Sequence, residues 1–209
     1  MIDLSRGFRD ELIIDDVVYP LDLSFGNVLR LLDMVHSDDV LVYLQPLLAL
    51  RMLISDEQMA LKLLEQIDLE IALKIFKEVV DEHIVIKQAK TSIPVYDLAG
   101  NLVEKRIKQS SIDDEEEEDE EIPLFSLKYD GDYIYASFLQ AYNIDLIEVC
   151  DSLHWQKFNA LLNGLPNGTK FVEVLKIRSW KEQESDSVEY RQSMYKLQEE
   201  YALPSYIEY

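Results

Sequence analysis

The stretch SFGNVLRLLDMV, residues 24–35, sets the fold class expected of this chain. Its apolar residues recur every three or four positions, a spacing that places them on one face of an α-helix. These residues are Phe25, Val28, Leu29, Leu32 and Val35. Similar patterns follow at about 40–54, 55–67, 68–86, 130–142, 155–163, from 171 and at 179–201. Gly and Pro are scarce, with 6 residues each, which also favours helices. The chain is therefore predicted to be mainly α.

Two short β-rich regions interrupt the helical pattern. Residues 11–21 hold apolar, β-branched runs on either side of Asp15-Asp16, which predicts a short N-terminal β-hairpin with a two-residue turn. A second small hairpin is predicted near 93–106, around the turn residues Gly100 and Asn101. The expected fold is a helical bundle that carries these two hairpins.

The middle of the chain has a different composition. Residues 113–121 are nine consecutive carboxylates, which repel one another and cannot be buried. We therefore expect a variable acidic linker over 91–128 that is disordered over 108–122. This linker separates a hairpin plus helical bundle at 1–90 from a second helical section at 129–209. The second section is expected to pack on the first as one compact unit.

Polar residues before the apolar runs predict where helices begin. Expected caps are Ser55 with Gln58, Asp68, Asp130, Asp145 with Glu148, and Ser179 with Glu182. Gly164 is expected to end the 155–163 helix in a left-handed turn. Cys150 would then lie on a helix that starts at Asp145, as a small buried apolar residue.

One cluster of large apolar residues predicts a core in the second section. Its members are Trp155, Phe158, Leu161, Leu162, Phe171 and Leu175. We expect them to pack together and against the helix at 132–142, because these residues share one face of each helix.

The charge limits the classes of partner. The chain has 20 basic and 41 acidic residues, a formal net charge of -21, which repels nucleic-acid phosphates and anionic membranes. The longest uncharged apolar run, 40–50, is 11 residues long, whereas a membrane span needs about 18. The N-terminus has no signal-peptide pattern, and the single Cys150 suits a reducing compartment. No nucleic-acid or membrane partner is expected, and the protein is expected in the cytoplasm.

No residue pattern indicates catalysis. His36, His83 and His154 are the only histidines, and none lies in an HExxH motif or at zinc-ligand spacing from a cysteine. The sequence has no GxGxxG or phosphate-binding loop and no GxSxG motif. Cys150 has no neighbouring basic cluster to activate its thiol. We expect no enzyme activity, metal, cofactor or small-molecule substrate.

Aromatic residues are the better indication of a contact surface. The chain has 12 tyrosines, and tyrosine is enriched in protein–protein interfaces. The C-terminal helix presents a stripe of Tyr190, Met194, Leu197 and Tyr201, which we take as candidate partner-binding residues. Packing inside the protein is the alternative interpretation of the same stripe. Apolar helix faces in the 24–86 bundle are a second candidate surface.

Parts of the second section resemble a known phage family. The segments Tyr133–Leu146, Leu153–Pro166, Thr169–Phe171 and Ile177–Trp180 are similar to the "phage gp fifteen-like" proteins of tailed phages and prophages of Gram-positive bacteria. Genes of that family lie in the tail module, upstream of the tape-measure gene. The resemblance implies a tail-assembly chaperone that binds the tape-measure protein, acts in the host cytoplasm and is absent from the mature virion. It supplies no catalytic residues, and it leaves self-association open.

A rival hypothesis starts from the charge. An acidic regulatory protein could mimic nucleic acid and block a basic partner, and such binding would weaken steeply with salt, unlike apolar binding. A third hypothesis, a structural component of the tail, would require far more β-structure than the sequence predicts.

Overall fold

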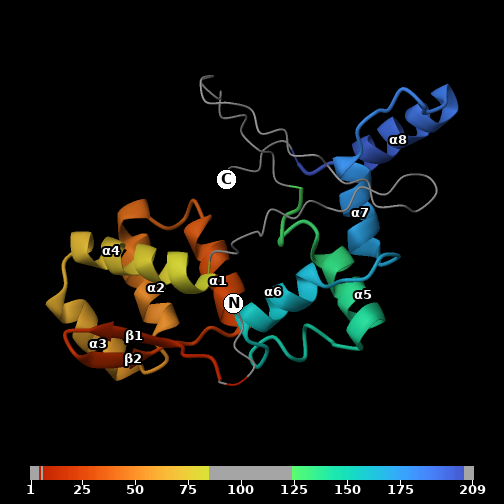
Figure 1. The fold of residues 1–209 in the computed structure, drawn as a ribbon. Helices are drawn as coiled ribbons and strands as arrows, with labels where there is room; N and C mark the ends of the chain where they lie inside the picture. Colours follow the sequence, from red (N-terminus) through yellow and green to blue (C-terminus); the bar gives the residue numbers. More distant parts are fainter. Residues whose placement is uncertain (1–4, 6, 85–123, 205–209) are drawn as a thin grey trace, which may run out of the picture. The chain divides into compact units, whose positions relative to one another are not determined.

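A computed structural model describes residues 5, 7–84 and 124–204 of the chain. The described part is mainly helical and has one two-stranded sheet near its N-terminus, so the predicted fold class is confirmed (Figure 1). The hairpin predicted near 93–106 and the acidic stretch 108–122 lie outside the described residues. The described residues on the two sides of the 85–123 gap belong to one compact unit.

The N-terminal hairpin forms as predicted. Strand β1 (Glu11–Ile14) pairs antiparallel with β2 (Val17–Pro20). Asp15 and Asp16 both have positive φ, at 48° and 63°, as a two-residue hairpin turn requires. Leu12 and Tyr19 lie opposite each other, and both are buried, so one face of the hairpin belongs to the core.

The first helical section packs around one central helix. Its elements are α1 (Phe25–Val35), the 3₁₀ turn η1 (Val42–Leu44), α2 (Gln45–Leu53), α3 (Glu57–Gln66), α4 (Leu69–Val79) and the π-helical turn η2 (Val80–Ile84). Helix α2 contacts α1, α3 and α4, and its Ala49, Leu50 and Leu53 are fully buried. Full burial of three apolar side chains on so short a helix makes α2 the centre of this section.

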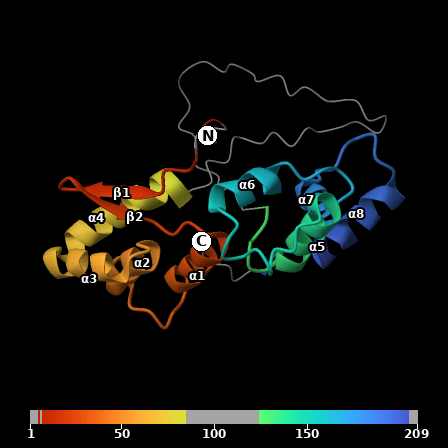
Figure 2. The ribbon, with the colours of Figure 1, turned by 90° about the horizontal axis from the view of Figure 1, so that it is seen from below.

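The second section contains four helices within its described residues, 124–204. They are α5 (Gly131–Tyr142), α6 (Trp155–Asn163), α7 (Lys170–Ser179) and α8 (Val188–Glu200). Helix α7 contacts both α5 and α8, and Figure 2 shows these three helices gathered together. A buried ion pair supports this arrangement, because Arg178 on α7 binds both carboxylate oxygens of Asp130 at 2.7 and 2.8 Å.

An aromatic core joins the two sections. Phe158 lies between Phe25, whose ring centre is 4.2 Å away, and Phe138, at 5.3 Å. Trp155 is 1% exposed, and its indole N–H donates to the carbonyl of Ile84 at 2.9 Å. The predicted core is confirmed for these residues and for Leu162 and Phe171, whereas Leu161 and Leu175 are only half-buried.

The turn region 144–153 differs from the prediction. The expected helix from Asp145 does not form, although one of its carboxylate oxygens accepts the N–H groups of Ile147 and Glu148, as a cap would. Carbonyl groups of the 144–153 backbone instead accept hydrogen bonds from the first turn of α1. Gly26 donates to Cys150 O and Phe25 donates to Leu153 O, both at 2.7 Å. These bonds satisfy amide groups that a helix start leaves free, and the carbonyls that accept them come from a segment that is not helical.

Other predicted caps also need correction. Ser55 does not cap α3, because its hydroxyl and amide both donate to Pro20 O; Asp56 caps the helix by accepting from Met59 N. Ser179 ends α7 and does not open a helix, and α8 begins after Ser187, whose hydroxyl accepts from Tyr190 N.

Two further corrections concern single residues. Gly164 has φ of -93°, so α6 does not end in a left-handed turn; Asn143, with φ of 52°, provides one after α5. Asp130 precedes α5, but its carboxylate accepts from Arg178 and from Ser126 N and does not cap the helix. Asp68 caps α4 as predicted, by accepting from Ile71 N.

Candidate functional site

Helix α4 carries two apolar stripes. The buried stripe, which faces α2, consists of Ala72, Ile75 and Val79. The second stripe consists of Leu69, Leu73, Phe76 and Val80, four residues spaced at i, i+4, i+7 and i+11. Leu69 is 44% exposed and Leu73 is 55% exposed. One helix therefore uses one face for the core and presents another apolar face at the surface.

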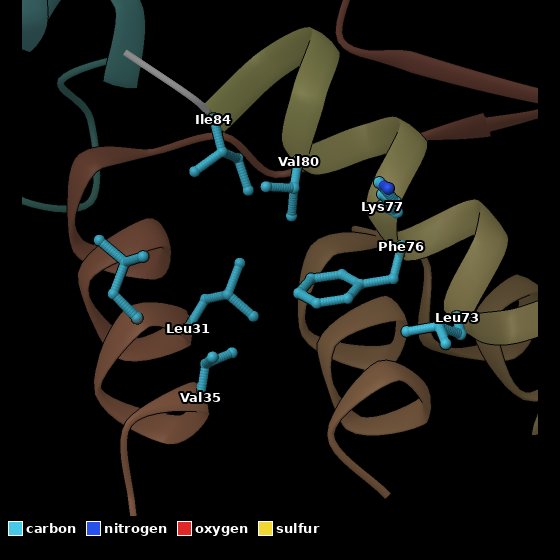
Figure 3. Close-up of a pocket in the computed structure, with 8 residues that line it drawn as sticks. Leu31, Val35, Leu73, Phe76, Lys77, Val80 and Ile84 are labelled. Carbon is cyan, nitrogen blue, oxygen red and sulfur yellow. The ribbon is translucent and has the colours of Figure 1, made fainter. Parts of the chain in front are cut away.

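The second stripe forms one wall of an apolar groove. The α1–α4 groove is lined by Leu31, Leu32, Val35, Leu73, Phe76, Lys77, Val80 and Ile84. It encloses about 310 Å³ between α1 on one side and α4 with η2 on the other. Figure 3 shows Leu31 and Val35 facing Phe76 and Val80 across this space. The groove has the shape and the chemistry to take up apolar side chains from a partner.

Lys77 is the only charged residue among those that line the groove. Figure 3 places it next to Phe76 on the same helix, at the edge of the apolar walls. It makes no hydrogen bond or ion pair with another described residue. An ammonium that has no partner among the described residues, beside an apolar groove, is available to a carboxylate of a partner, in a chain that otherwise has an excess of acidic groups.

The sequence indicates apolar helix faces in the 24–86 bundle but does not locate this groove. Phe76 belongs to the second stripe of α4 and lines the groove. The signal is present in the sequence: apolar residues at 69, 73, 76 and 80 repeat with helical spacing beside the first stripe. Two stripes on one helix indicate either complete burial or an open binding face.

The four candidate residues on α8 serve mainly to hold that helix in place. Met194 is buried, and Leu197 is half-buried. The hydroxyl of Tyr201 accepts from Lys170 Nζ at 2.6 Å, so it joins the end of α8 to α7. Tyr190 is 41% exposed, and its ring packs edge-on against Trp180. A partner-binding role for the four stays a prediction, and Tyr190 is the most accessible of them.

A polar cluster surrounds the exposed side of α8. The Glu182 carboxylate accepts from the Tyr195 hydroxyl at 2.6 Å and pairs with Arg191. The Tyr195 hydrogen bond and then the Arg191 contact hold the pKa of Glu182 below its ordinary value. The same carboxylate raises the pKa of Tyr195. Both groups are satisfied by each other, which indicates a surface contact and not a reactive centre.

The three histidines lie apart and have structural partners. His36 ends α1, and its Nδ1 lies 2.7 Å from Leu32 O. His83 lies in η2. His154 caps α6, because its Nδ1 accepts from Gln156 N at 3.1 Å, and its Nε2 lies 3.0 Å from a carboxylate oxygen of Asp10. The imidazole therefore carries its proton on Nε2 and donates to Asp10. This pair joins the N-terminal arm, residues 7–10 before β1, to the start of α6.

The remaining polar groups in the described part of the chain lie apart from one another. Cys150 is half-buried in the 144–153 turn and not on a helix, as corrected above. Among residues 5, 7–84 and 124–204, no three His, Cys, Asp or Glu side chains come together in a metal-binding group. The same part of the chain contains no helix that is long and apolar enough to span a membrane.

Comparison with known proteins places the chain. No match was found among curated proteins or among solved structures. The family model described as "Bacteriophage Gp15 protein" matches residues 8–203, which covers both helical sections and most of the chain. The chain therefore belongs to the bacteriophage Gp15 protein family.

Proposed function

We propose that this phage protein is a non-enzymatic tail-assembly chaperone that binds the tape-measure protein and keeps it soluble. The observation that carries the proposal is the α1–α4 groove, an open apolar groove between two helices. A tape-measure protein is long, helical and apolar, and it would aggregate before the tail tube encloses it. A groove of this kind covers one apolar helix face, which removes that face from water.

The charge of the chain fits the same role. The net charge of -21 lies mostly outside the groove walls, where Lys77 is the single charged residue. A complex with a strongly acidic surface repels other copies of itself and stays in solution. In this proposal the protein acts in the host cytoplasm and leaves before the tail is complete, because a bound coat would obstruct the tube.

Co-expression provides the test. The tape-measure protein is produced with and without this chain, and its soluble fraction and co-purification at moderate and high salt are measured. We expect a larger soluble fraction and a complex that survives high salt, because apolar contacts are not screened. Binding that disappears at high salt would favour the acidic-mimic hypothesis. If the chain neither raises the soluble fraction of the tape-measure protein nor co-purifies with it, the chaperone proposal is refuted.

Two surface variants locate the contact. Leu73→Glu places a charge in the groove at a residue that is 55% exposed, so the fold should tolerate it. Val188→Glu makes the same charge change at the start of α8, where a carboxylate suits the helix N-terminus. We expect Leu73→Glu to abolish solubilisation and Val188→Glu to preserve it. The reverse result would assign the contact to α8.

A further inference from the structure

We propose that the α1–α4 groove binds one amphipathic helix whose apolar face is flanked by a carboxylate, and that Lys77 selects that carboxylate. The inference rests on the proposed function, because the helix is taken to be a segment of the tape-measure protein. It states what kind of segment binds, how long the contact is and which residue sets its charge preference.

The walls of the groove favour a helix over an extended strand. Both walls are helical, so their backbone groups are already bonded within α1 and α4 and offer no sheet edge for strand addition. The α4–η2 wall runs from Leu73 to Ile84, which is roughly 16 Å at about 1.5 Å per residue. That length matches about three turns of a partner helix, with anchors at i, i+3 or i+4, and i+7.

The position of Lys77 defines the charge of the partner. Phe76 and Val80 point into the groove, and Lys77 lies about 100° around the helix from Phe76, at the outer margin of the stripe. Glu78 lies about 200° from Phe76, on the opposite side of α4. Lys77 is the one charged residue that lines the groove, so its ammonium is the charge that a docked helix meets beside its apolar face. A carboxylate on the partner pairs with it, and a cation there is repelled.

A peptide experiment tests this inference directly. Three fluorescent amphipathic helical peptides of about 18 residues carry leucines at the anchor positions and differ only at one flanking position, which holds Glu, Gln or Lys. Their binding to the full chain is measured by anisotropy at low and high salt. We expect the Glu peptide to bind about two- to fivefold more tightly than the Gln peptide at low salt, and the Lys peptide to bind more weakly than both.

Three variants of the chain assign the effect. Lys77→Glu should reverse the order, so that the Lys peptide binds best, while the fold is kept because Lys77 is exposed. Leu73→Glu should weaken all three peptides by at least about tenfold, because docking would bury its charge. Val188→Glu, outside the groove, should leave all three affinities unchanged. Circular dichroism confirms that each variant is folded.

Several results would overturn the inference. Equal affinities for the three peptides, or an order that Lys77→Glu leaves unchanged, would remove Lys77 as the selecting residue. Binding unaffected by Leu73→Glu would remove the groove as the site. If sedimentation shows a dimer that Leu73→Glu dissociates, a second copy of the chain occupies the groove.

Co-expression with the tape-measure protein separates this inference from the proposed function. If both Leu73→Glu and Lys77→Glu still solubilise the tape-measure protein, the chaperone function stands and the groove is not its binding site. If the wild-type chain binds the peptides selectively but does not solubilise the tape-measure protein, the groove stands as a helix-binding site and the chaperone function is refuted.

Discussion

Gly26 is a residue at which a single methyl group decides whether two parts of the chain fit. A Cβ at this position would lie 2.9 Å from an Asp151 carboxylate oxygen and 3.1 Å from Cys150 O. The Asp151 side chain can move, but the Cys150 carbonyl accepts the Gly26 N–H and is fixed. We expect Gly26→Ala to lower the free energy of unfolding by about 1–3 kcal/mol. Urea unfolding measures the change.

A matched glycine provides the control. Gly131 is the first residue of α5, as Gly26 is the second of α1, and a Cβ there meets nothing within 4 Å. Gly131→Ala should leave stability unchanged or raise it by up to about 1 kcal/mol, because alanine favours helix. Equal effects of the two substitutions would show that the contact with Cys150 is unimportant.

His154 combines a helix cap with a link to the N-terminal arm. Its Nδ1 accepts from Gln156 N, its Nε2 donates to Asp10, and its ring stacks on Phe8 at 3.7 Å. His154→Ala removes all three contacts and should cost about 1–2 kcal/mol in thermal or urea unfolding. His154→Asn keeps a capping side chain and should cost less. An asparagine variant as unstable as the alanine variant would show that the cap contributes little.

The hydrogen bond from Tyr135 to Asp145 affects the pKa of the Asp145 carboxyl. The Glu148 amide contributes most to the lowered pKa of Asp145, and the Tyr135 hydroxyl, 3.0 Å away, also lowers it. A lowered pKa stabilises the fold above the unfolded-state value, and this stabilisation is lost as the pH falls through the folded-state value. Tyr135→Phe should therefore raise the pKa of Asp145 toward its ordinary value. Carboxyl NMR titration measures it, and an unchanged pKa would contradict the hydrogen bond.

At the scale of elements, the Asp130–Arg178 pair holds α7 against the start of α5. The Asp130 side chain is 1% exposed and that of Arg178 is 10% exposed, and Arg178 also donates to the carbonyls of Tyr201 and Leu124. Asp130→Ala leaves a buried cation without its carboxylate and should cost about 3–5 kcal/mol. Denaturant unfolding, read from circular dichroism, measures the loss.

The exposed Arg30–Asp151 pair serves as the reference for this prediction. Its side chains are 57% and 73% exposed, so Arg30→Ala should cost no more than about 1 kcal/mol. Similar costs for Asp130→Ala and Arg30→Ala would indicate that water reaches the Arg178 guanidinium in the Asp130→Ala variant and solvates its charge.

Local sequence predicts elements well where a helix depends on its own residues. The apolar spacing of α1 and α4, the Asp68 cap and the Asp15-Asp16 turn all lie within a few neighbouring residues, and the structure has each of them. The prediction was wrong where a residue far along the chain determines the local hydrogen bonds. Asp145 has the pattern of a cap, yet the 144–153 backbone is drawn into bonds with α1. Ser55 is likewise engaged by Pro20, 35 residues away.

At the scale of the whole molecule, Trp155 connects sections that are distant in sequence. It is fully buried, stacks with Phe158, and donates to Ile84 across 71 residues. Trp155→Ala should cost about 3–5 kcal/mol, because it leaves a large cavity. Far-ultraviolet circular dichroism and thiol labelling of Cys150 should report one common unfolding midpoint. A cost below about 1 kcal/mol would place Trp155 at the surface. Two separate midpoints would show that the sections unfold independently.

The candidate site was only partly predictable for the same reason. Sequence periodicity identifies the apolar stripes of α1 and α4, but a groove exists only where two stripes line one space that no other side chains fill. The stripe on α8 looked equally accessible in sequence, yet Met194 is buried by neighbours that periodicity does not specify. The sequence does not mark Lys77 as a contact residue, because an isolated lysine on a helix is ordinary. Its role in binding depends on the apolar walls beside it.

The bond between Trp155 and Ile84 gives the chain a built-in optical reporter. Ile84 lines the groove, and its carbonyl accepts the indole proton, so a ligand that displaces Ile84 changes the surroundings of the chromophore. The only other tryptophan is Trp180, beside α8 and far along the chain from the groove. With Trp180 replaced by phenylalanine, the remaining emission spectrum and the single indole resonance would follow occupancy of the groove without any label.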